Sequence, residues 1–300
     1  MDGIRKYKSL YLMALPGIIY FIIFHYLPMI GVVIAFQNFK PSLGLKGIFL
    51  SEWVGFQHIT RFFQSYYFSR VFFNTISISG LKLIFGFPAP IILAIIINEI
   101  KNNKYKRIVQ SVSYLPHFLS WVIVVSLIQF ILSPTTGFVN QVLEMLGKET
   151  IFFLGSPKYF RSVLILSNIW KSIGWGSIVY LASISSIDEA IYEAALIDGA
   201  SRFQKMWHIT LPGIREIMII SLILNIGNLL DAGFQQIFLL YSPAVYNVAD
   251  IIDTYVYREG LIKTNYSFGT AVGLTKSIIA LMLVTLTNKL AKKFETRALW

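Results

Sequence analysis

The sequence contains no cysteine, and only 14% of its 300 residues are charged. Without cysteine, the chain has no disulfide, no thiolate metal ligand and no cysteine nucleophile. The low charge argues against a soluble protein, because soluble domains carry about 25% charged residues. The apolar residues instead gather in runs that are too long and too free of charge for the core of a soluble protein. The sequence therefore predicts an integral membrane protein.

The sequence also lacks the arrangements of residues that are typical of enzymes and metal sites. No nucleophile is paired with a base, and no cluster of Asp, Glu or Cys lies near His25 or His117, which are the histidines within apolar runs. No GxxxxGK[ST] phosphate loop is present, so the chain is not itself an ATPase. We expect no catalytic residue, no metal and no cofactor in this chain.

The net charge of +11 raises the question of nucleic-acid binding. The basic residues, however, are scattered among the short segments that separate the apolar runs. Lys and Arg are enriched in just these segments at the cytoplasmic face of membrane proteins, where they also meet anionic lipids. We therefore expect the lipid bilayer, and not nucleic acid, to be the partner of these residues.

Six apolar segments are each long enough to cross about 30 Å of hydrocarbon at 1.5 Å per residue. Each contains at most one charged residue, and no internal repeat is evident. The sequence thus predicts an all-α polytopic protein with one membrane domain over residues 1–300. The six segments are Leu10–Phe36, Val71–Ile97, Ser111–Leu132, Ser162–Ile184, Ile217–Leu240 and Phe268–Asn288.

The distribution of Lys and Arg predicts the orientation of the six spans. The amino terminus, the connection 98–110 and the carboxyl-terminal tail are short and rich in basic residues, which places them in the cytoplasm. The loops 37–70, 133–161 and 235–267 then lie outside and are rich in aromatic residues. These aromatics form either an interfacial belt or a contact surface for an external partner.

The cytoplasmic loop 185–213, between spans four and five, has the pattern of two short helices. Ser186 with Glu189 fits one capping box, and Ser201 with Gln204 fits a second. Gly199 stands where the first helix would end in a left-handed residue, and Pro212 is expected to end the second.

The second of these helices carries apolar residues that require a partner. Phe203, Met206 and Trp207 follow the helical spacing i, i+3 and i+4, on the cytoplasmic side. The loop has more acidic than basic residues, so anionic lipids would repel it. A groove on another protein is therefore the better partner for this helix.

The loop resembles a known signature. Glu193-Ala194-Ala195, three residues, Gly199, nine residues and then Ile209-Thr210-Leu211-Pro212 match the pattern EAA-x3-G-x9-I-x-L-P without a departure. This pattern is typical of permease subunits of bacterial ATP-binding-cassette (ABC) importers. The segments LPGIIYFIIFHYLPMIGVVIAFQNF and YSFGTAVGLTKSIIALMLVTLTN are similar to the carbohydrate-uptake branch, and closest to its complex-oligosaccharide and polysaccharide subgroup.

The resemblance implies a type I ABC importer permease of the bacterial cell membrane that works by alternating access. It implies a second, related permease, two ATPase subunits that bind ATP and Mg, and an extracytoplasmic solute-binding protein that delivers a carbohydrate. It also places the ATPase-docking surface on the loop. The docking residues expected are Glu193, Ala194, Ala195, Gly199, Phe203, Met206, Trp207, Ile209, Leu211 and Pro212.

Four ionisable side chains, Lys82, Lys171, Asp231 and Lys276, lie within spans, where a charge that faces lipid costs at least about 2.5 kcal/mol. In one interpretation, Asp231 pairs with Lys171 or Lys276 and fixes the packing. In the other, some of these groups line a hydrated path together with amides and aromatic faces that suit a sugar. The path residues expected are Trp170, Lys171, Trp175, Asn225, Asn228, Asp231, Gln235 and Lys276.

Two other functions compete with the importer. A secondary transporter driven by an ion gradient would use the intramembrane charges, but it leaves the loop motif without a role. An intramembrane enzyme would need a catalytic pair, and the neighbouring Lys276 and Ser277 do not face each other, because adjacent helical positions point about 100° apart.

Overall fold

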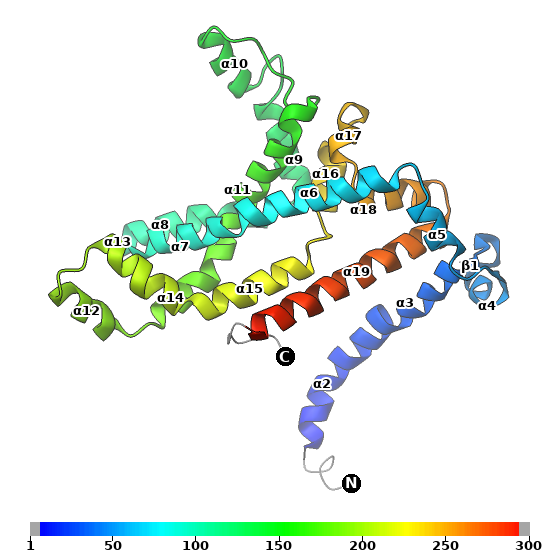
Figure 1. Ribbon diagram of the computed structural model, residues 1–300, viewed down its shortest axis with the longest axis horizontal. Coiled ribbons are helices and arrows are strands. Elements are labelled where there is room, and N and C mark those ends of the chain that lie inside the picture. The colour runs from blue at the N-terminus through cyan, green and yellow to red at the C-terminus, as the bar shows by residue number, and fades with distance from the viewer. Residues whose placement is uncertain (1–6, 294–300) are drawn as a thin grey trace. The chain divides into compact units, whose positions relative to one another are not determined.

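The computed structural model describes residues 7–293 and is almost entirely helical (Figure 1). Its one small sheet pairs β1 (Gln37–Asn38) with β2 (Glu52–Trp53) in antiparallel register, with Gln37 opposite Trp53. The chain forms two compact units. Within the described residues, the first comprises 7–68 and 255–277, and the second comprises 69–254 and 278–293.

The first unit begins with an apolar helical run over residues 8–36, in which α2 is followed by a π-helical turn, α3 and a 3-10 segment. Rings of Phe62, Phe68, Tyr255 and Phe268 meet in its core, with centroids 5.1–6.3 Å apart. The helices are α2 (Lys8–Phe21), α3 (Leu27–Met29), α4 (Gly47–Leu50), α5 (Gln57–Phe63), the end of α18 (Ile252–Val256), and the first part of α19 (Tyr266–Lys293). Further helical turns cover Ile22–Tyr26, Ile30–Phe36, Pro41–Lys46 and Tyr257–Ile262.

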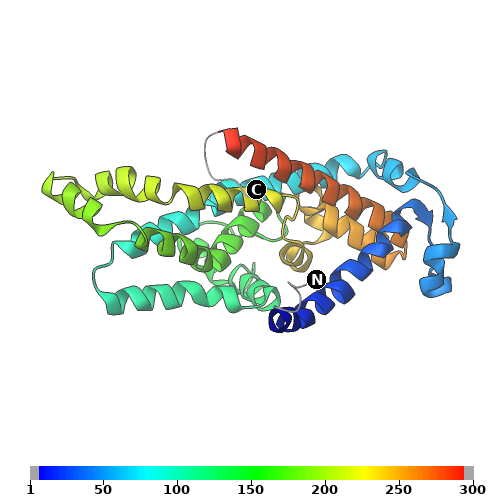
Figure 2. The ribbon, with the colours of Figure 1, turned by 90° about the horizontal axis from the view of Figure 1, so that it is seen from below.

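The second unit packs its helices around two apolar clusters. One cluster joins Val125, Phe160, Ile237 and further residues, and the other joins α7 with α11. The long α11 lies along α7 (Figure 2). The helices are α6 (Phe68–Gly86), α7 (Pro88–Asn98), α8 (Asn103–Tyr114), α9 (Trp121–Ile131), α10 (Phe138–Met145), α11 (Pro157–Ser185), α15 (Arg215–Gly227), α16 (Phe234–Leu240) and α17 (Tyr246–Ala249). Short 3-10 turns cover Leu115–Phe118 and Pro243–Val245.

A close backbone contact positions α11 against α8. A Cβ at Gly174 would lie 1.9 Å from the carbonyl oxygen of Ser113. Only glycine allows the two backbones to approach this closely.

Helices occupy all six predicted spans, but two spans are broken. Lys8–Phe36, Phe68–Asn98 and Tyr266–Lys289 are long and apolar enough to cross a membrane. The fourth predicted span lies within the 29 residues of α11. Span three bends by 102° between Asn103–Phe118 and Trp121–Ile131. Span five ends its first helix at Gly227 and resumes only at Phe234. The sequence patterns located these two segments but not the breaks within them.

Candidate functional site

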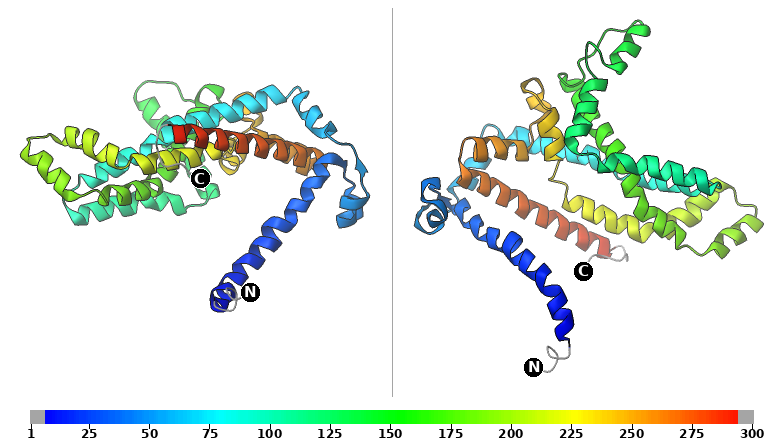
Figure 3. Two further views of the ribbon diagram at one scale, coloured as in Figure 1. Left: turned by 60° about the horizontal axis from the view of Figure 1, so that its bottom comes forward. Right: turned by 180° about the vertical axis from the view of Figure 1, so that it is seen from behind.

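The loop 185–213 folds into two short helical segments that extend away from the other helices of the second unit (Figure 3). The first is α12 (Glu189–Ile197). Its N-cap is Asp188, whose carboxylate accepts a hydrogen bond from the backbone N–H of Ala190 at 3.0 Å. The capping box expected from Ser186 and Glu189 was therefore wrong. A carboxylate caps a helix N-terminus as well as a hydroxyl does, and its negative charge interacts favourably with the positive end of the helix dipole.

The end of α12 agrees with the sequence. Gly199 has φ +76°, its N–H donates to the carbonyl of Leu196 at 3.1 Å, and the N–H of Ala200 donates to that of Ala195 at 2.9 Å. These two bonds form a Schellman motif, which needs a left-handed residue at Gly199. The sharp turn between the two helices therefore depends on this glycine.

The second segment begins at Ser201 with the predicted capping box. The Ser201 hydroxyl accepts from the N–H of Gln204, and the Gln204 side chain accepts from the N–H of Ser201. The helix runs through α13 (Arg202–Lys205), a π-helical turn (Met206–Thr210) and α14 (Leu211–Gly213). It thus ends one residue beyond Pro212, as expected.

This segment has one face toward the membrane helices and one toward the solvent. Phe203 and Trp207 are 67% and 58% exposed, and their rings stack with centroids 6.3 Å apart. Met206 and Leu211 instead pack against the apolar cluster of α7 and α11. The geometry therefore gives Met206 and Leu211 a different role from the one expected, since they fix the loop to the bundle.

The exposed side of the loop also includes Glu193 and Ala194 of the signature, while Ala195 is half-buried. A cavity of about 320 Å³ lies between the two helices of the loop. It is lined by Ala195, Ala200, Gln204, Lys205, His208 and Ile209. The loop thus offers a stacked aromatic pair, a carboxylate and small residues that permit close approach.

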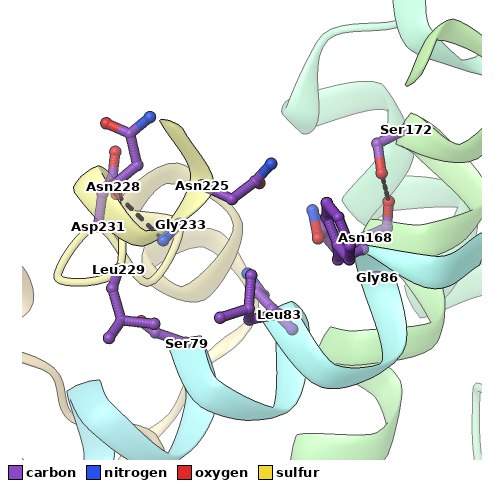
Figure 4. Close-up of a pocket in the computed structure, with 12 residues that line it drawn as sticks. Ser79, Leu83, Gly86, Asn168, Ser172, Asn225, Asn228, Leu229, Asp231 and Gly233 are labelled. Carbon is purple, nitrogen blue, oxygen red and sulfur yellow. Dashed lines mark hydrogen bonds between the residues drawn. The ribbon is translucent and has the colours of Figure 1, made fainter. Parts of the chain in front are cut away.

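A second candidate site is a polar cavity of about 240 Å³ between α6, α11 and the broken span five (Figure 4). Asn225, Asn228 and Asp231 come from span five, and Asn168 and Ser172 come from α11. The rest of the wall is Ser79, Lys82, Leu83, Gly86, Phe87, Leu229 and Gly233. Amides, hydroxyls and one charge of each sign are concentrated in this cavity.

Three of the eight expected path residues, Asn225, Asn228 and Asp231, line this cavity. Trp170 lines a separate apolar cavity of about 530 Å³ between α9 and α11. Trp175 stacks on the His117 ring at 4.6 Å. Gln235 is exposed on α16, and Lys276 belongs to α19 in the first unit.

Lys171 does not pair with Asp231. Its amine donates to the backbone carbonyls of Pro116, His117 and Leu119, and it lies 5.6 Å from the centre of the Trp121 ring. The Asp231 carboxylate accepts from the N–H of Gly233 at 3.1 Å. The Lys171 alternative for the ion pair was therefore wrong.

The cavity wall also contains Ser79, Lys82, Asn168 and Ser172, which were not predicted as path residues. Lys82 was visible as an intramembrane charge, but it was not placed in the site. One feature of the sequence could have indicated the place of the cavity. The run Asn228–Gly233 is a polar and glycine-containing interruption inside an apolar segment, and such an interruption is typical of a broken helix at a transport site.

The sequence matches a known protein family. Residues 86–299 match the family described as binding-protein-dependent transport system inner membrane component. The chain belongs to this family. The permease is therefore a membrane subunit of a binding-protein-dependent transport system, and the match gives no support to the ion-gradient alternative or to an intramembrane enzyme.

Individual members of known transport systems are similar to this chain over nearly its full length. The permease is 45% identical to protein LplB of Bacillus subtilis strain 168, covering 100% of this chain and 93% of that protein. It is 46% identical to the polygalacturonan/rhamnogalacturonan transport system permease protein YteP of the same organism, covering 98% and 90%. It superposes with a TM-score of 0.90 and 43% identity on a chain of a bacterial alginate ABC transporter crystallised with an alginate pentasaccharide-bound periplasmic protein, covering 99% of both chains.

Proposed function

We propose that the permease forms one half of the pathway of an ATP-driven importer and carries an oligosaccharide with negatively charged sugar units. The relatives support a carbohydrate, since their names include polygalacturonan/rhamnogalacturonan, arabinooligosaccharides and alginate. The acidic class rests on the two most similar of these. Polygalacturonan is a polymer of uronic acid, and alginate is described as an acidic polysaccharide.

The observation that carries the proposal is the chemistry of the polar cavity. Asn168, Asn225 and Asn228 present amides, which both donate to and accept from sugar hydroxyls. The Lys82 ammonium uses two of its three N–H donors on protein oxygens, so one remains for a carboxylate of the substrate. A cavity of about 240 Å³ receives part of one oligosaccharide at a time.

Energy enters through the loop 185–213 in this proposal. The exposed Phe203 and Trp207 insert into a groove of an ATPase subunit, and Glu193 meets a donor there. ATP and Mg are bound by that partner. Closure of two ATPases would draw two such loops together, one from each permease, and open the cavity to the outside.

The substrate class is tested with the complete importer in proteoliposomes, with its binding protein, second permease and ATPases. Oligogalacturonates and neutral arabino-oligosaccharides of equal length are supplied in turn. We expect the acidic series to stimulate ATP hydrolysis and to be accumulated. Uptake of the neutral series alone would contradict the acidic substrate but leave the importer intact, whereas ATP-independent uptake of either series would contradict the importer.

The docking surface is tested by replacing both Phe203 and Trp207 with Ala. Buried aromatic anchors contribute about 2 kcal/mol or more each to an interface, so the loss of both should lower the affinity for the ATPase by about 1,000-fold. Phe138→Ala is the matched control, because Phe138 is 68% exposed on α10, in a predicted outer loop. Equal ATPase capture by the double variant and the control would exclude this surface as the docking site.

A further inference from the structure

Lys171 of α11 lies against the break in span three. At that break the chain leaves α8 through the 3-10 turn Leu115–Phe118 and restarts as α9 after Ser120. The last carbonyls of a helix have no partner within it. The Lys171 amine donates to three carbonyls in this stretch, those of Pro116, His117 and Leu119, at 3.3, 2.7 and 2.5 Å. One side chain from a neighbouring span thus serves the acceptors that the bend releases.

Lys82 of α6 lies in the same way against the break in span five. Its amine donates to the carbonyl of Ala232 at 2.8 Å and to the Gln236 side-chain oxygen at 2.5 Å. Gly233 starts α16 with φ +86°, and a Cβ there would lie 2.6 Å from the Lys82 amine. The Lys82 position therefore depends on the absence of a side chain at residue 233.

The helices beyond the two breaks pack against each other. Val125 of α9 shares one apolar cluster with Ile237 and Leu240 of α16. The Gln236 amide ties α16 to α11 through the Leu164 carbonyl and the Ser167 hydroxyl, both at 2.8 Å. The halves of spans three and five beyond the breaks therefore form one packed pair.

We propose that Lys171 and Lys82 are positioning residues for transport. Lys171 binds three main-chain carbonyls at the break in span three, and Lys82 binds the Ala232 carbonyl and the Gln236 side chain at the break in span five. Together they hold the α9–α16 pair at a fixed angle to α8 and α15. Lys82 also fixes the segment Asn228–Gly233, which carries part of the cavity wall. Water is scarce within a bilayer, so the acceptors at a break need a donor from the protein. The transport measurements rest on the proposed function, but the angle at span three is measured without transport.

The angle is read as a distance between two spin labels on the purified, nucleotide-free complex. The chain has no cysteine, so Cys replacements of the exposed Tyr105 and Phe130 are labelled selectively. At 1.5 Å per residue and a bend of 102°, these positions lie about 23 Å apart, against about 37 Å in a straight helix. Lys171→Met should broaden the distribution and shift its mean by about 5–15 Å toward the longer distance.

Two control variants distinguish the loss of the Lys171 donors from a general disturbance of α11. Lys171→Arg keeps donors at the carbonyls and should keep the short distance, whereas Lys158→Met removes a lysine from the same helix away from the break and should leave it unchanged. If Lys171→Met does not assemble, Lys171→Gln replaces it, because one amide cannot reach three carbonyls. An unshifted distance in Lys171→Met, or in Lys171→Gln, would overturn the proposal.

The break in span five is tested through Gly233→Ala, which displaces the Lys82 amine without removing it. The matched control is Gly147→Ala, since Gly147 also has positive φ (+71°) but open space around it. Gly233→Ala and Lys82→Met should each lower the sugar molecules imported per ATP hydrolysed at least fivefold, with the ATPase still bound. An equal loss in Gly147→Ala, or an unchanged ratio in Gly233→Ala, would overturn the role of Lys82.

Discussion

Gln236 connects three spans, and its replacement by Leu should destabilise the permease strongly. Its side chain is completely buried. Its oxygen accepts from Lys82, and its amide donates to the Leu164 carbonyl and the Ser167 hydroxyl. Leucine has a similar volume but no polar atoms. The substitution therefore removes three hydrogen bonds without opening a large cavity.

The magnitude follows from the kind of bond that is lost. Interhelical hydrogen bonds between neutral groups in membrane proteins contribute about 0.6 kcal/mol each on average. A hydrogen bond to a charged group contributes about 1.5–3 kcal/mol, and Lys82 keeps only the Ala232 carbonyl. Gln236→Leu should thus lower the free energy of unfolding by about 3–4 kcal/mol.

The adjacent Gln235 provides the control, since it is exposed on the same helix. Gln235→Leu should change the free energy by no more than about 0.5 kcal/mol. Both variants are unfolded reversibly in mixed micelles, with tryptophan fluorescence as the signal. A difference below about 1 kcal/mol between the two variants, or a gain in stability for Gln236→Leu, would refute the role given to this network.

Two further predictions test packing in the second unit. Gly174→Ala should cost about 1–3 kcal/mol or more, because its Cβ would lie 1.9 Å from the Ser113 carbonyl oxygen. Gly80→Ala, which has open space within α6, should be neutral or stabilise by up to about 1 kcal/mol, and equal melting temperatures for the two would contradict this. Arg161→Met should lower stability by about 2–4 kcal/mol, since it leaves the Val248 carbonyl and the Asn74 side-chain oxygen without this donor; an unchanged unfolding midpoint would disprove it.

Elements governed by local sequence could be predicted well. Helices fill all six predicted segments, because long apolar runs favour helices that can cross a bilayer. Gly199 and the capping box at Ser201 were predicted correctly, since both depend on residues within one turn. The cap at Asp188 was missed because a better-known pattern, Ser186 with Glu189, stood beside it.

The positions of the two breaks and the hydrogen-bond partners of the lysines could not be predicted from local sequence. A bend at Pro116 is compatible with the sequence, but so is a kinked continuous helix. Whether the Lys171 amine donates to carbonyls or pairs with a carboxylate depends on which part of span three lies beside α11. Tertiary packing decides this, and the local sequence does not. The ion pair with Asp231 was the simplest way to neutralise a buried charge, yet the structure uses Lys171 at the break.

An intramembrane lysine can form an ion pair with a carboxylate or can donate to main-chain carbonyls. The two arrangements have different consequences for the selection of substrates. An ion pair would neutralise the charge but take the lysine donor away from the carbonyls of His117, Leu119 and Ala232, whereas an ammonium on these carbonyls satisfies both needs at once. Lys171 therefore contributes to the backbone, and its charge is not directed at the substrate. The groups left to meet a sugar in the cavity are chiefly the amides of Asn168, Asn225 and Asn228, together with the remaining donor of Lys82. Selection among sugars should accordingly respond more to changes at these amides than to changes at Lys171.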